Sequence, residues 1–334
     1  MFIRKITRNN NHTLLQVLDS IVFGGINGLI ENVFPPQSGN YRLLTTDNDI
    51  SFVKLDFLFY RICGLVTVTN ESSCYNMVTI LKFIEFLLKS ESSPFVVDAC
   101  KYHYAKISQY AAQILPTPTT KDETKKYSMH KCNRRHLQNS IKTDAVSAWL
   151  LYASFYYVTG QYTIALRLID YVLSRCTLDM VYISFPSNKT DMKSYAQLVH
   201  YSVSLEAKMK IATIDCVSYM SHSPFIPAEL EFMVEKSMIS LPPVVMAHCL
   251  RFLSYHHLGD YFNSQKVLND LFLTVKTRYF ISKDEMSDSY TILGVCCEIS
   301  GDKDTACQHY NEAKSILDLK FNKMHGQNEV GVVK

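Results

Sequence analysis

Apolar residues recur every three or four positions along much of the chain, and this spacing predicts helices that bury one face. Residues 72–89 are a clear early case, with apolar side chains at Met77, Ile80, Leu81, Ile84, Leu87 and Leu88. Residues 13–34 and 49–68 predict two further helices. A fourth has Ser93 as its N-cap and Pro94 in its first position, and it ends before Pro116. We therefore predict an N-terminal helical bundle over residues 1–115.

The helical periodicity is lost between residues 116 and 142. Pro116 and Pro118 lie among threonines, and a polar, charged run follows them. This composition is typical of a linker or long loop between two helical regions. The cations of the run could bind phosphates, but we favour a solvated linker for Lys121, Lys125, Lys126, Lys131, Arg134 and Arg135.

Helical hairpins are predicted from residue 143 onward, and Thr143 and Asp144 can cap the first helix. Three hairpins turn at small polar corners that begin with Gly160, Gly259 and Gly301. The last hairpin has the clearest spacing: Tyr290, Leu293, Gly294, Cys297, Gly301, Ala306, Tyr310 and Ala313. Helix, glycine turn and second helix in a unit of about 34 residues is the tetratricopeptide pattern. We therefore predict an irregular tetratricopeptide-like array over residues 143–320.

Small residues are expected where the two helices of a hairpin cross, since they let the backbones approach closely. We pair Ala153 with Ala165 and Gly294 with Ala306 on this basis. The full set of predicted repeat-packing residues is Trp149, Ala153, Gly160, Ala165, Gly259, Gly294, Gly301, Ala306 and Ala313. Candidates for a binding groove are Tyr152, Tyr156, Tyr255 and Asn263, although packing roles suit the three tyrosines better.

The spacing of the glycine corners shows where the array is irregular. Gly160 and Gly259 are 99 residues apart, which leaves room for degenerate helices around residues 195–220 and 227–237. Gly259 and Gly301 are 42 residues apart, so an insertion of about eight residues is implied, which we place at 277–283. Ser282 and Glu285 then form a predicted capping box. Residues 321–334 are predicted to be a disordered tail.

Composition and charge narrow the class of protein. The chain is 47% hydrophobic and 19% charged, which excludes wholesale disorder. Its net charge of +3 is too small to imply nucleic acid or a membrane as a partner. Ten cysteines without a CxxC pair indicate buried thiols in a reducing compartment. With no signal peptide and no membrane span expected at 14–34, we predict the cytoplasm, or the nucleus.

No set of side chains predicts a metal site. His130, Cys132 and His136 lie within seven residues, but a fourth ligand with suitable spacing is missing. The adjacent His256 and His257 would point to different faces of a helix. We therefore expect no metal and no cofactor.

Catalytic motifs are also missing from the pattern. The pair Asp47 and Asp49 resembles magnesium-binding carboxylates, but no Gly-Ser loop precedes it, and helix capping explains it better. The sequence has no glycine-rich phosphate loop, no nucleophile elbow and no HExxH. We predict no catalytic residues and no enzymatic activity.

Five stretches resemble the C-terminal half of Mab-21-like proteins, the family that includes the cyclic GMP-AMP synthase-like sensors. They are residues 89–93, 98–104, 153–162, 255–260 and 278–281, and the likeness covers roughly residues 50–318. The resemblance implies a helical region whose nucleotidyltransferase core, with a Gly-Ser motif and acidic metal ligands, lies upstream. No position here matches those motifs, and Cys296 and Cys297 do not match the family's zinc-binding insertion. The chain therefore looks like a C-terminal fragment, the product of a truncated gene model, or a paralogue that kept only the helical part.

These observations predict an all-α protein, with a helical bundle followed by tetratricopeptide-like hairpins. The function that we favour is a non-enzymatic scaffold that binds a peptide or helix of another protein. The alternative is the accessory half of a nucleotidyltransferase-type immune sensor, which would bind nucleic acid or regulate an absent catalytic domain. Upstream coding sequence with a Gly-Ser loop and an acidic pair would favour that alternative. From the modest charge we expect nucleic-acid binding to be weak or absent.

Overall fold

Helices account for 72% and strands for 5% of the residues that the structure describes, so the predicted all-α class is confirmed. The structure is a computed structural model. It describes residues 53, 56–57, 81–82, 84–86, 88–89, 94–114, 123–183, 189–200, 203–235 and 237–328. The helix predicted at 13–34, most of the one at 49–68 and the pair Asp47 and Asp49 lie outside these residues. No helix in the described part is long and apolar enough to cross a bilayer.

Helix α5 (Pro94–Ile114) begins at its proline, as the sequence predicted, and it packs against α6 (Glu123–Ser140). The second helix corrects the prediction of a linker or long loop at 116–142, because 18 of those residues are helical. Its buried face includes Leu137, but also Asn133 and Ser140, so an apolar stripe is absent from the sequence. Packing against α5 and α7 replaces the missing hydrophobic periodicity.

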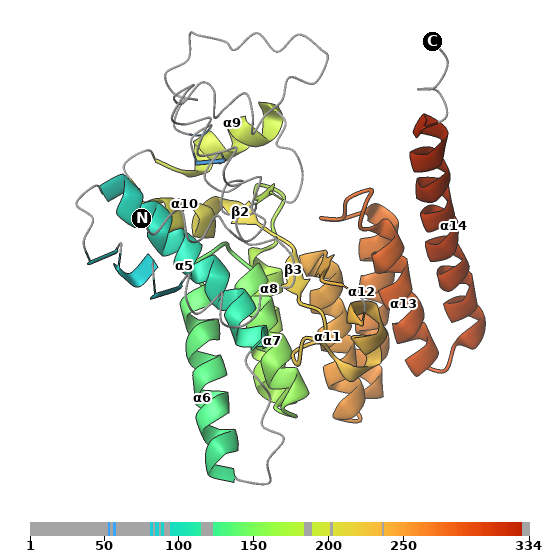
Figure 1. The fold of residues 1–334 in the computed structure, drawn as a ribbon. Helices are drawn as coiled ribbons and strands as arrows, with labels where there is room; N and C mark the ends of the chain where they lie inside the picture. Colours follow the sequence, from blue (N-terminus) through green and yellow to red (C-terminus); the bar gives the residue numbers. More distant parts are fainter. Residues whose placement is uncertain are drawn as a thin grey trace.

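The described residues include three helical hairpins, which follow one another across the fold (Figure 1). They are α7 (Ser147–Val158) with α8 (Tyr162–Arg175), α11 (Pro243–His257) with α12 (Tyr261–Thr277), and α13 (Met286–Ile299) with α14 (Lys303–Asn328). The turns contain Gly160, Gly259 and Gly301, with φ of 74°, 73° and 93°. An L side chain rarely adopts this conformation, so the predicted corners are confirmed, with their physical reason. The tetratricopeptide arrangement of the hairpins stays a prediction.

The stretch between the first two hairpins mixes short helices with short strands. Helices α9 (Lys189–Leu198) and α10 (Leu205–Ala212) and the 3₁₀ helix η1 (Ala228–Val234) agree with the predicted degenerate helices. Strands replace helix at the end of the first predicted stretch: β2 (Thr213–Ile214) pairs in parallel with β1 (Val181–Tyr182). After β2, strand β3 (Val217–Tyr219) pairs antiparallel with β4 (Ile239–Leu241).

Three of the nine predicted repeat-packing residues, Ala153, Ala165 and Ala306, lie in the main hydrophobic core, which extends from Ala112 to Ala306. The three turn glycines of that set are exposed. The buried members are Ala153, Ala165, Gly294 and Ala306, and Ala313 is also buried. Trp149 is half-buried, and its indole meets the Tyr171 ring edge-on at 5.1 Å between centroids. A second cluster joins Val53 and Phe57 to α9 and α10. Helix α14 continues to Asn328, which corrects the predicted disorder for residues 321–328.

Candidate binding pocket

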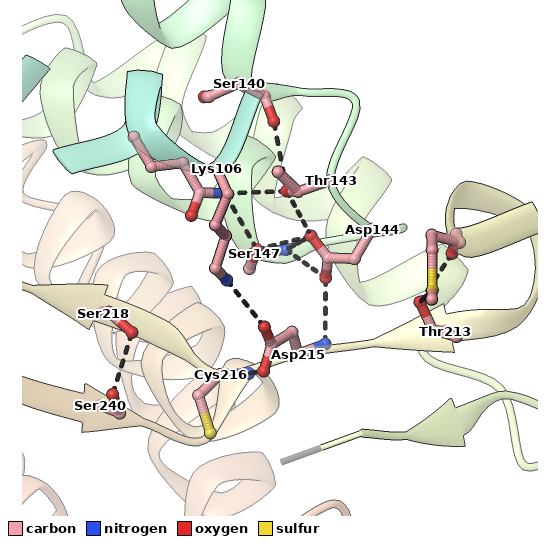
Figure 2. A network of polar contacts seen from close by, with 12 residues as sticks. Lys106, Ser140, Thr143, Asp144, Ser147, Thr213, Asp215, Cys216, Ser218 and Ser240 are labelled. Carbon is pink, nitrogen blue, oxygen red and sulfur yellow. Dashed lines mark hydrogen bonds and ion pairs between the residues drawn. The ribbon is translucent and has the colours of Figure 1, made fainter. Parts of the chain in front are cut away.

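Two buried carboxylates and a lysine meet where α5, the start of α7 and the β2–β3 segment come together (Figure 2). The Lys106 ammonium group donates to Asp215 Oδ2 over 2.8 Å, and both side chains are 8% exposed. The Asp215 backbone N–H donates to Asp144 Oδ2 over 3.0 Å. Asp144 also accepts from the Ser147 backbone N–H at 2.9 Å, so it caps α7 as the sequence predicted.

The electrostatics of this centre favour a structural role. Burial lowers the pKa of Lys106, but the attraction and hydrogen bond of Asp215, together with the Tyr110 and Tyr102 hydroxyls, outweigh it, and the pKa ends well above its ordinary value. Burial raises the pKa of Asp144, and the neighbouring Asp215 charge raises it further. A lysine that stays protonated is neither a nucleophile nor a base. We interpret the centre as a buried ion pair that fixes three elements relative to one another.

A second polar cluster surrounds the carboxylate of Glu285. Its Oε1 accepts from the Tyr182 hydroxyl at 2.8 Å and from the Cys216 thiol at 2.6 Å. Its Oε2 accepts from the Ser282 backbone N–H at 2.8 Å, while Ser282 Oγ accepts from the Glu285 N–H at 3.1 Å. These reciprocal bonds confirm the predicted capping box. A hydrogen bond from a thiol to a carboxylate disfavours the thiolate form that a nucleophile requires. We therefore interpret this cluster, like the ion pair, as a structural contact between elements of the fold.

A cavity of about 410 Å³ lies between the first and second hairpins. Helices α8, α11 and α12 supply most of its lining, and Cys176 and Tyr279, just beyond the ends of α8 and α12, supply the rest. The lining residues are Leu173, Cys176, Val244, His248, Arg251, Asp270, Leu273, Thr274 and Tyr279. Its volume falls within the range of known ligand pockets. The pocket joins residues about a hundred positions apart in the chain, which sequence periodicity alone does not bring together.

Polar and charged side chains line the pocket from α11 and α12. His248 and Arg251 are three residues apart and so share one face of the helix. The Arg251 guanidinium forms an ion pair with Asp170 of α8, with 3.3 Å between Nη2 and Oδ1. Asp270 approaches from α12, on the other hairpin. The pocket therefore offers hydrogen-bond donors and acceptors beside the apolar side chains of Leu173, Val244 and Leu273.

Two titratable groups of the pocket, the His248 imidazole and the Cys176 thiol, are held in uncharged forms. Burial lowers the pKa of His248 to about 4, and the attraction of Asp270 opposes this only in part. Burial raises the pKa of the Cys176 thiol to about 12. The Tyr279 hydroxyl donates to the Cys176 carbonyl oxygen over 2.7 Å. A neutral imidazole and a protonated thiol with no bond between them provide no catalytic pair, so the arrangement suits binding.

None of the four candidate groove residues lines this pocket. Tyr152 and Tyr156 are each 8% exposed, with 3.0 Å between their hydroxyl oxygens. The Arg134 guanidinium of α6 lies 5.8 Å from the centre of the Tyr156 ring, so α6 covers this pair. The half-buried Tyr255 lies 6.0 Å from the Arg251 guanidinium, close to the pocket. Asn263 donates its backbone N–H to Asp260 at the start of α12, which is a capping contact.

The histidine and cysteine candidates remain separate from one another. His130, Cys132 and His136 lie on α6, where the His130 ring packs edge-on against Phe155. In the part of the chain that the structure describes, no group of three or more histidine, cysteine or acidic side chains could hold a metal ion. His257 hydrogen-bonds Glu229 over 3.1 Å, which ties the α11–α12 turn to η1.

The sequence does not predict the polar residues of the pocket, which are His248, Arg251 and Asp270. The sequence carries only a weak signal for them: His248 and Arg251 interrupt the apolar run from Val244 to Leu253 in α11. Comparison with known proteins gave no match: no family model, no curated protein and no solved structure matches the chain. The resemblance to Mab-21-like proteins therefore stays a prediction.

Proposed function

We propose that this protein is a non-enzymatic helical-repeat protein whose pocket between α8, α11 and α12 takes a segment of another protein. The observation that carries the proposal is the pocket itself, at about 410 Å³ and lined by both apolar and polar side chains. Successive helical hairpins present extended surfaces that suit protein segments. The neutral His248 and the protonated Cys176 thiol favour binding over chemistry.

The lining indicates what kind of segment would fit. Leu173, Val244 and Leu273 offer an apolar surface for one large aliphatic or aromatic side chain. Arg251 can donate hydrogen bonds and Asp270 can accept them. A peptide main chain carries both C=O acceptors and N–H donors, so it can satisfy both residues. We therefore expect the partner to present an apolar anchor residue on a short segment.

The test is a pull-down with the purified full chain, with mass spectrometry of what it retains. Leu273 is 53% exposed, so Leu273→Asp should place a charge in the pocket without unfolding the helix. The matched control is Leu319→Asp, since Leu319 is a leucine with 66% exposure on α14, outside the pocket. We expect Leu273→Asp to lose the retained protein and Leu319→Asp to keep it.

Two results would contradict the proposal. Equal retention by wild type and Leu273→Asp, with unchanged melting temperatures, would show that the pocket is not the binding surface. Retention of nucleic acid through washes at physiological salt would favour the sensor alternative. A cross-linked peptide mapped to α8 or α12 would instead identify the segment that occupies the pocket.

A further inference from the structure

Positive charge is concentrated in a single helix of the fold. Helix α6 contains five lysine and arginine residues and one acidic residue, Glu123, which makes its formal charge +4. The whole chain has a formal charge of +3, so the remainder carries −1. In the sequence these cations are spread along a predicted linker, whereas the helix brings several of them onto one face.

The exposed face of α6 displays the basic side chains, while the opposite face packs. Lys131, Arg134 and Arg135 are exposed and spaced as neighbours on a helix surface. Leu137 and Ser140 are fully buried against the rest of the protein. Figure 1 places α6 at an edge of the fold, with α5 and α7 on one side of it. The basic face is therefore directed away from the core.

These three cations form no ion pair with the residues that the structure describes. Arg134 does lie over the Tyr156 ring, at 5.8 Å, but the residue remains exposed. Lys142, just beyond the end of α6, is in contrast paired with Glu206 at 3.7 Å. Like charges three and four residues apart destabilise a helix, by about 0.2–0.5 kcal/mol per pair. An anionic partner would relieve this repulsion.

We propose that the exposed basic face of α6 binds an acidic segment of a partner protein, through its glutamate or aspartate carboxylates. Arginine guanidinium groups bind carboxylates with two parallel hydrogen bonds, and Arg134 and Arg135 offer two such groups. The face is short, because 18 helical residues span about 27 Å. Beyond it the chain is slightly acidic, so a long polyanion such as duplex DNA would gain nothing outside the helix. A short acidic segment matches both the length and the charge of the face.

This site is separate from the pocket between the hairpins, and it can be tested without knowing the natural partner. The probe is a fluorescein-labelled 16-residue peptide rich in glutamate, with its glutamine analogue as a control, measured by fluorescence anisotropy at 150 mM NaCl. The variant reverses the basic face of α6: Lys131→Glu, Arg134→Glu and Arg135→Glu. The matched control reverses three exposed lysines on other elements: Lys266→Glu, Lys283→Glu and Lys314→Glu.

The glutamate peptide should bind wild type and the control variant with similar affinity, and the glutamine peptide should bind neither. The α6 variant should lose about tenfold or more in affinity, since each close charge pair contributes to binding. Equal loss in both triple variants would overturn the proposal, because it would reduce the effect to net charge. Tighter binding of a 20-base-pair DNA duplex or of phosphatidylserine vesicles would overturn it as well. Melting temperatures of both variants establish that each is folded.

Discussion

The Tyr310 ring of α14 occupies the space into which a side chain on Gly294 of α13 would project. A Cβ atom on Gly294 would lie 2.6 Å from Tyr310 Cε1, closer than real Cβ contacts occur. The Tyr310 hydroxyl donates to Glu298 of α13 over 2.8 Å, which holds the ring against that helix. The small residue predicted at the crossing is therefore matched by a large one on the facing helix.

The contact predicts the effect of adding volume at this crossing. Gly294→Leu should reduce the free energy of unfolding by about 1–3 kcal/mol, because Tyr310 must leave its place. Ala306→Arg should cost more, since Ala306 is 2% exposed and the variant buries an unpaired charge. Lys303→Ala, in the exposed first turn of α14, should change stability by less than about 0.5 kcal/mol. Thermal melts of the three variants check this, and a wild-type melt for Gly294→Leu would contradict it.

The glycine turns give a second prediction, which concerns backbone strain alone. Nothing lies within 4 Å of a Cβ on Gly259, so a side chain there meets no steric obstacle outside the backbone. Its φ of 73° remains unfavourable for L residues. Gly259→Val should destabilise by about 1–2 kcal/mol, and Gly259→Asn by less, because asparagine tolerates the left-handed region. Urea denaturation measures both, and equal stability of the two variants would argue against strain as the cause.

The sequence could predict the hairpins because their signals are local. A left-handed turn requires glycine, and an amphipathic helix shows its period within a few turns. Helix α6 shows the limit of this reasoning. Its buried face contains Asn133 at 4% exposure and Ser140 at 0%, so no hydrophobic stripe announces it. Pro116 and Pro118, which precede α6, instead favour a linker when the sequence is considered alone.

The sequence does not predict the pocket or the two polar clusters either, and the reason is different from that for α6. Asp270 lies on the second hairpin and Leu173 on the first, and no local pattern relates them. The Cys216 and Glu285 side chains are likewise 69 residues apart. Strands of two or three residues, such as β2, are too short for an alternating pattern to be recognised. Tertiary packing creates these sites, so only the structure reveals them.

A third prediction concerns the buried ion pair. Asp215→Ala removes the carboxylate and leaves the Lys106 charge buried without its 2.8 Å partner. We expect a loss of about 3–5 kcal/mol in the free energy of unfolding. The double variant Lys106→Met with Asp215→Leu should recover much of that loss, because neither charge remains to be desolvated. Chemical denaturation of the two variants decides it, and a double variant less stable than Asp215→Ala would contradict this account.

The last prediction concerns pH. The pKa of His248 is about 4 in the folded protein because burial disfavours its charged form, whereas an unperturbed histidine titrates near 6.5. Between these values the unfolded chain binds the proton and the folded chain does not. Stability therefore falls as pH decreases from about 6.5 toward 4, and at pH 5 this group alone should cost on the order of 2 kcal/mol.

Replacing the imidazole should remove that dependence. His248→Gln keeps a polar side chain but takes up no proton, so its unfolding free energy should fall less than that of wild type between pH 7 and pH 5. His103 on α5, whose pKa burial also lowers to about 4, provides an independent comparison. His103→Gln should flatten the profile by a similar amount, and the double variant should flatten it by the sum. Urea melts at pH 7, 6 and 5 measure all three profiles. If His248→Gln followed the wild-type profile, His248 would have to be protonated in the folded pocket, and its neutral role in binding would have to be abandoned.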